Sequence, residues 1–167
     1  MSRGFVKEGD QEEVPLVPPR ADLPAGETNY VTQVGLDALL AEKEEMLREI
    51  TLLDTTNENE YRIALNYINA RLLLLTERIA TAKIIDVKEQ PRDEVRFGAT
   101  VTLQIDKSNK LQKFQIVGAD EADITKGKIA FVAPLARLLM EKKVGDEAIL
   151  KLARGNRVFK IVAIGYE

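Results

Sequence analysis

Residues 61–82 read YRIALNYINARLLLLTERIATA. Apolar side chains recur along this stretch at alternating spacings of four and three residues, at Tyr61, Leu65, Ile68, Leu72, Leu75, Ile79 and Ala82. Such a spacing places a continuous apolar stripe along one side of a helix, as in a coiled coil. A lone helix cannot bury this stripe, so another segment must cover it.

The segment before this stretch has the required apolar surface. We expect a helix to begin near Thr32, a favourable N-cap, because apolar residues follow at positions 36, 39, 40, 46, 47, 50 and 53. Residues 54–61, DTTNENEY, then interrupt the apolar pattern. Two amphipathic segments joined by a short polar link predict an antiparallel helical hairpin within one chain. We therefore expect a monomer with a helical finger and DTTNENEY at or near its tip.

The hydrophobic period changes after residue 87. Short runs that alternate or are continuously apolar predict strands, at VRFGATVTLQI (95–105), KLQKFQIVG (110–118), KIAFVA (128–133), EAILKLA (147–153) and RVFKIVAIGY (157–166). Between them, PLARLLMEKK (134–143) predicts a short helix, since Pro134 suits the first helical position. The fold class expected is α+β, with a coiled-coil hairpin followed by a small antiparallel sheet with one short helix.

The chain divides into three segments. Residues 1–29 contain four prolines and the acidic run EGDQEE, so we expect an extended or disordered arm. Residues 30–86 would form the hairpin, and residues 87–167 the C-terminal domain. The last segment carries fifteen basic and eleven acidic side chains, whereas the first two are acidic. This balance is weaker than the basic bias of a dedicated duplex-DNA binder.

Composition excludes several kinds of site. The chain has no Cys and no His, which excludes disulfides, thiolate metal sites and a Ser-His-Asp triad. Any metal ion would need oxygen ligands, as Mg²⁺ and Ca²⁺ do. No apolar run approaches the roughly 20 residues of a membrane-spanning helix. The opening MSRGFVKEGDQ lacks the apolar region of a secretory signal, so we expect a cytoplasmic protein with no membrane partner.

Several motifs in this order resemble the bacterial Gre transcription elongation factors. The blocks FGATVTL (97–103), IVGADEAD (116–123) and APLARLLMEKKVGDEAIL (133–150) are similar to three consecutive blocks of that family. AKIID (82–86) is similar to the end of the family's hairpin, and Thr32-x-x-Gly35-x-x-x-Leu39 resembles its opening T-x-x-G-x-x-x-L. The resemblance covers about residues 30–167 and leaves out the arm.

The resemblance implies a fold and a partner. The C-terminal domain would be FKBP-like and would dock on RNA polymerase at the rim of the secondary channel, with the finger inside the channel. The protein would act by binding rather than as an enzyme, with no cofactor of its own. The residues implied in polymerase contact lie in two groups, Asp120, Glu121 and Asp123 in one loop and Ala133, Pro134, Leu135 and Arg137 around the short helix.

The acidic tip carries the chemistry that the resemblance implies. In cleavage factors of the family, tip acids help the polymerase hold a second Mg²⁺, and the tip resembles G-D-x-x-E-N-A-E-Y. Here the acids follow D-x-x-x-E instead, and the residues concerned are Asp54, Asn57, Glu58 and Glu60. Three interpretations remain open: support of metal-dependent RNA cleavage, modulation or occlusion of the channel without cleavage, and a solvated turn.

Two further interpretations concern basic and aromatic residues. Arg62, Arg71 and Arg78 would contact nascent RNA if they matched the family's basic patch; otherwise they form a solvated helix face. An FKBP-like domain also raises the alternative of a peptidyl-prolyl isomerase, whose pocket needs clustered aromatics. The C-terminal segment offers Phe97, Phe114, Phe131, Phe159 and Tyr166. Core packing is the simpler explanation for the three that lie in strand patterns, Phe97, Phe131 and Phe159.

Overall fold

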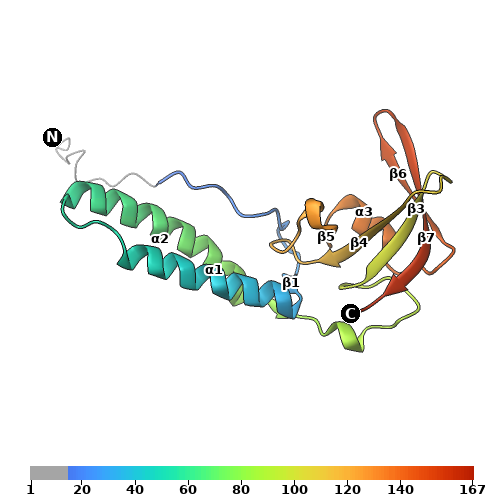
Figure 1. Ribbon diagram of the computed structural model, residues 1–167, viewed down its shortest axis with the longest axis horizontal. Coiled ribbons are helices and arrows are strands. Elements are labelled where there is room, and N and C mark those ends of the chain that lie inside the picture. Colours follow the sequence, from blue (N-terminus) through green and yellow to red (C-terminus); the bar gives the residue numbers. More distant parts are fainter. Residues whose placement is uncertain (1–14) are drawn as a thin grey trace.

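The computed structural model describes residues 15–167, in which a helix pair and a curled sheet lie at opposite ends of an elongated molecule (Figure 1). The α+β class is therefore confirmed. Part of the expected arm, residues 1–14, lies outside the described residues. Residues 15–29 contain no helix or strand and run beside the helix pair before entering the first strand.

Helices α1 (Gln33–Thr51) and α2 (Glu58–Thr81) pack against each other and run in opposite directions (Figure 1). Their shared core consists of four buried side chains, Leu39, Met46, Ile68 and Leu75, with Ile50, Leu53, Leu72 and Ile79 packed around them. The stripe predicted on residues 61–82 thus faces the partner helix. On α1 the prediction was too broad, because Leu40 and Leu47 remain 43% and 41% exposed.

Side-chain caps define where both helices begin. The Thr32 hydroxyl accepts a hydrogen bond from the Gly35 amide at 2.9 Å, which confirms the predicted N-cap of α1. The Asn57 side chain accepts from the Glu60 amide at 3.0 Å and caps α2. Residues 52–57 connect the helices, so the second half of DTTNENEY belongs to α2.

The C-terminal sheet has five strands in the order β5-β4-β3-β7-β6. Their bounds are β3 Thr100–Ile105, β4 Leu111–Val117, β5 Lys128–Ala130, β6 Glu147–Leu152 and β7 Gly155–Gly165. The expected all-antiparallel sheet was wrong at one edge, where β5 pairs parallel to β4. The reason is the connection of residues 118–127, which carries the chain back along β4 so that β5 begins beside Gln115.

A short helix and two small elements complete the C-terminal half. Helix α3 (Pro134–Leu139) begins with Pro134 as predicted and contacts β6. Two single-turn 3-10 helices are also present, η3 (Val87–Glu89) and η4 (Ile124–Lys126). Within residues 15–167, no helix is long and apolar enough to cross a membrane.

A second, two-stranded sheet joins the helix pair to the rest of the molecule. Strands β1 (Tyr30–Val31) and β2 (Lys83–Ile84) pair in parallel, so the start of α1 and the end of α2 are held together. The sequence did not predict this pairing, because two residues are too few to show a period.

All five aromatic residues of the C-terminal half lie in its core. Phe97, Phe114, Phe131, Phe159 and Tyr166 are each 7–8% exposed. The Tyr166 hydroxyl donates to the Glu94 carbonyl and accepts from the Arg96 amide, both at 2.7 Å, and burial raises its pKa above the usual 10.0. These positions agree with core packing, the simpler of the two explanations for the aromatics.

Candidate functional site

The tip of the helix pair is an exposed acidic turn. Asp54 lies in the connection between the helices, and its carboxylate accepts a hydrogen bond from the Thr56 amide at 2.9 Å. This bond lowers the pKa of Asp54 below its ordinary value. Glu58 is the first residue of α2 and Glu60 lies in the same turn. Negative charges at this end of a helix interact favourably with the helix dipole.

The tip residues do not form a metal site by themselves. Asp54 precedes α2, so Asp54 and Glu58 are not paired as i and i+4 on one helix. Asn57 uses its side-chain oxygen as the cap of α2. Across the described residues, no group of three or more acidic, His or Cys side chains is arranged to hold a metal ion. If these acids help to bind Mg²⁺, the remaining ligands must come from another molecule.

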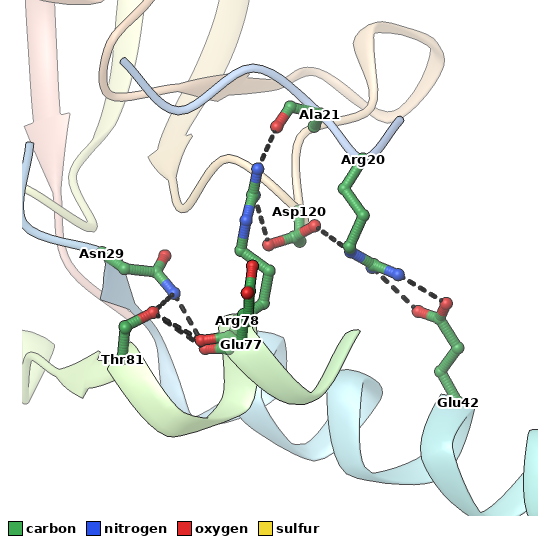
Figure 2. Close-up of polar contacts among 8 residues, drawn as sticks. All are labelled: Arg20, Ala21, Asn29, Glu42, Glu77, Arg78, Thr81 and Asp120. Carbon is green, nitrogen blue, oxygen red and sulfur yellow. Dashed lines mark hydrogen bonds and ion pairs between the residues drawn. The ribbon is translucent and has the colours of Figure 1, made fainter. Parts of the chain in front are cut away.

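The acidic loop after β4 lies at the junction between the two halves of the chain. Figure 2 shows Asp120 between two guanidinium groups, each of which donates a hydrogen bond to one of its carboxylate oxygens. Arg20 donates to Oδ1 at 2.9 Å and Arg78 to Oδ2 at 2.8 Å, and the Asp120 side chain is only 7% exposed. Arg78 also donates to the Ala21 carbonyl. Asp120 is therefore not a solvated acid of the loop surface.

Glu121 makes the matching contact at the start of α1. Its carboxylate accepts from the Thr32 hydroxyl at 2.6 Å and pairs with Lys128 at 3.2 Å, and it too is 7% exposed. The T-x-x-G motif thus has a structural reason: Thr32 caps α1 and bonds to Glu121, and Gly35 leaves room for that carboxylate. Asp123 lies at the surface instead and caps η4, and a hydrogen bond from Thr125 lowers its pKa.

The second group of predicted contact residues surrounds the start of α3. Ala133 occupies the N-cap position without a side-chain hydrogen bond. Pro134 and Arg137 are exposed, whereas Leu135 is half-buried against the core. Arg137 donates to the Val132 carbonyl at 2.9 Å and to Glu27 of the arm at 3.1 Å. This group presents an exposed surface that Asp120 and Glu121 do not share.

The three arginines of α2 have different surroundings. Arg62, near the tip, is exposed and bonds to Asn59 at 2.7 Å. Arg71 lies 3.4 Å from Glu49 of α1 and stacks near the Tyr67 ring, 5.7 Å from its centroid. Arg78 belongs to the junction with Asp120. They do not form one continuous basic patch, and the RNA-contact prediction remains a prediction.

Sequence reasoning missed the residues that complete the junction. Arg20 of the arm donates to both oxygens of Glu42 on α1, at 2.8 and 3.0 Å, in addition to Asp120 (Figure 2). Its hydrogen bond to Glu42 raises the pKa of Arg20 above its ordinary value. The residues paired here are up to 100 positions apart. No local signal identifies such partners.

Comparison with known proteins explains why these blocks occur together. The transcription elongation factor GreA of Francisella tularensis subsp. novicida is 32% identical over 157 residues, which cover 93% of this chain and 98% of that protein. This chain belongs to the Gre family of transcription elongation factors. Residues 90–166 also match the family model described as transcription elongation factor, GreA/GreB, C-term. GreA of Hyphomonas neptunium is 37% identical over 117 residues, which cover 68% of this Gre-family chain and 74% of the Hyphomonas protein.

Two solved structures are also similar to this chain. Gfh1, the GreA factor homolog 1 of Thermus thermophilus, is 22% identical and covers 83% of this chain and 99% of its own, with a TM-score of 0.40. The GreA/GreB factor of Nitrosomonas europaea is 19% identical and covers 82% and 98%, with a TM-score of 0.43. The assignment of this chain to the Gre family rests on its sequence relatives.

Proposed function

We propose that this Gre-family protein binds RNA polymerase at its secondary channel and regulates transcript elongation. The observation that carries the proposal is the 32% identity to a GreA factor over 93% of the chain, which includes the helix pair as well as the sheet. The helix pair also projects from the sheet as a finger, with its acidic turn at the far end (Figure 1). The protein acts through binding, and it is not itself an enzyme.

The finer assignments belong to the same proposal. The helix pair is an antiparallel coiled coil, the C-terminal half is FKBP-like, and the protein works in the cytoplasm as a monomer. The sheet docks on the polymerase through the exposed residues at the start of α3, Pro134 and Arg137. Asp123, which caps η4, is a further proposed contact residue.

The tip has two candidate roles within this function. In one, Asp54 and Glu58 complete the coordination of an Mg²⁺ ion that the polymerase already holds, which requires only one or two added carboxylates. In the other, the finger enters the channel and modulates the polymerase without promoting RNA cleavage. The exposed, ionised state of Asp54 suits the first role. Its place outside α2 shows that the turn, not a helix face, sets the separation of the two acids.

Binding to core polymerase tests the main proposal. We expect a tagged full-length chain to retain bacterial core RNA polymerase at low salt. Arg137→Ala should weaken that binding by about fivefold or more, since interface anchors contribute over about 1 kcal/mol. Arg157→Ala is the matched control, because Arg157 is also an exposed, ion-paired arginine, 53% against 51% exposed. No binding by either the full chain or a variant without residues 1–29 would refute the proposal.

Backtracked elongation complexes distinguish the two roles of the tip. If the acids support cleavage, the wild-type chain should accelerate release of the RNA 3′ fragment and an Asp54→Ala/Glu58→Ala variant should lose that acceleration. An unchanged binding affinity would show that the variant still docks. Equal cleavage with wild type and variant would exclude a role for these acids in the reaction.

A further inference from the structure

The arm, here residues 15–29, touches both halves of the molecule. Pro18, Pro19 and Arg20 line a hollow against α1 and α2, together with Met46 and Leu74. Farther along, Leu23 packs against the core of the C-terminal sheet. The arm therefore crosses the junction from the helix pair to the sheet, independently of the chain segments that connect the two (Figure 1).

Arg20 is the residue of the arm whose side chain bonds to both halves of the molecule. Its guanidinium forms a two-pronged contact with Glu42 of α1 and a third hydrogen bond to Asp120 of the loop after β4 (Figure 2). Such paired contacts fix direction as well as distance, because the guanidinium is planar. One side chain thus links α1 to the loop after β4, in addition to the contacts that Thr32 and Arg78 make with the same loop.

Burial separates this contact from ordinary surface ion pairs. The side chains of Arg20, Arg78 and Asp120 are 17%, 16% and 7% exposed and that of Glu42 is 40% exposed, whereas Arg48 and Glu45 on α1 are 59% and 57% exposed. Exposed pairs contribute little, but removing one partner of a buried pair leaves the other charge poorly compensated. Without Arg20, Asp120 would keep Arg78 as its ion-pair partner among residues 15–167, and Glu42 would lose the ion pair it makes there.

We propose that the arm is a strap that fixes the direction of the helix pair relative to the sheet, with Arg20 as its latch. The strap also withholds the carboxylate of Asp120, one of the acids that the family resemblance implies in polymerase contact; this second part rests on the proposed function. Release of Arg20 frees the helix pair to pivot and exposes one oxygen of Asp120.

The pivot can be measured on the free protein. The chain has no Cys, so Leu52→Cys and Leu111→Cys create unique spin-label sites, at exposed positions beyond the end of α1 and at the start of β4. Helix α1 is roughly 28 Å long at 1.5 Å per residue, so a 10° pivot at its base moves its far end by about 5 Å. We expect a narrow distance distribution in the wild-type background and one broadened by about 5 Å or more in Arg20→Gln.

Two further variants make the measurement specific. Arg48→Gln removes the same charge from an exposed pair of α1 and should leave the distribution narrow. Arg20→Lys keeps the positive charge but loses the planar, two-pronged donor group, and should give a distance distribution of intermediate width. Equal widths for wild type, Arg20→Gln and Arg48→Gln would overturn the strap.

The second part is tested by polymerase affinity of the same variants. If Asp120 is withheld, Arg20→Gln should change the dissociation constant for core polymerase by about fivefold or more, whereas Arg48→Gln should not. A broadened distribution with an unchanged dissociation constant would overturn only the withholding of Asp120. Failure of every variant to bind would count against the proposed function, and the strap would still be decided by the distances.

Discussion

Gly118 allows the first strand to approach the C-terminal half. A Cβ at this position would lie 2.6 Å from the carbonyl oxygen of Tyr30, closer than real Cβ contacts. Gly35 is similar, but the atom it would meet at 2.8 Å is the end of the Glu121 side chain, which can turn away. The backbone of β1 has no such freedom, so Gly118 is the more restrictive position.

We expect Gly118→Ala to lower the free energy of unfolding by about 1–3 kcal/mol, since overpacking of a fixed backbone has this cost. Urea denaturation followed by circular dichroism measures the change. Gly165→Ala is the control, because a Cβ there would meet nothing within 4 Å. Equal stability of the two variants would show that β1 shifts without cost.

The start of α1 connects helix formation to assembly of the junction. Thr32 caps the helix through Gly35 and also donates a hydrogen bond to Glu121, a carboxylate that is 7% exposed. One hydroxyl therefore stabilises both the start of α1 and the contact of α1 with the loop after β4. The cap could be predicted from residue types near the helix start, but the bond to Glu121 could not, because 89 positions separate the two residues.

Thr32→Ala should lower the free energy of unfolding by about 2–3 kcal/mol, of which about 1 kcal/mol reflects the lost cap and the rest the poorly paired Glu121. Thr32→Ser keeps the hydroxyl and should recover most of this loss. Thr76→Ala, at an exposed position of α2, is a control for removing a threonine from a helix. A loss no larger than that of Thr76→Ala would argue against both contacts.

At the scale of the whole molecule, the aromatic cluster around Tyr30 joins the two halves. The Tyr30 ring lies 5.9 Å from Phe97 and 5.6 Å from Phe131, between ring centroids, and the two Phe rings are 5.6 Å apart. Tyr30 lies in β1, which leads into α1, whereas both Phe residues belong to the C-terminal core. Loss of this contact should therefore uncouple the two halves.

We expect the wild-type chain to unfold in one transition, with helix content and the tyrosine signal of the core changing together. Tyr30→Ala should cost about 2–4 kcal/mol and separate the two signals, because the large ring contact is lost. Far- and near-ultraviolet circular dichroism during thermal unfolding measure this. Tyr67→Ala, at a 39% exposed position of α2, is the control. Coincident transitions in Tyr30→Ala would contradict the coupling.

Local patterns were sufficient for the long helices and the strands of the five-stranded sheet, but not for the two-residue strands β1 and β2. The 4-3 spacing on residues 61–82 predicted the inward face of α2, Thr32 predicted the start of α1, and alternation predicted the five strands. These features depend on neighbours within a few residues, so their periods are visible in the chain itself. The acidic turn between the helices was predictable for the same reason.

Contacts between distant segments were decided by the tertiary structure alone. The parallel pairing of β5 with β4 depends on how a ten-residue connection folds back, and the parallel pairing of β1 with β2 depends on the packing of both helices. The same holds for Asp120, which the family resemblance implied in polymerase contact and not in a contact within the chain. Only the assembled chain brings Arg20 and Arg78 to it, because a buried carboxylate is tolerated where cations from other segments surround it.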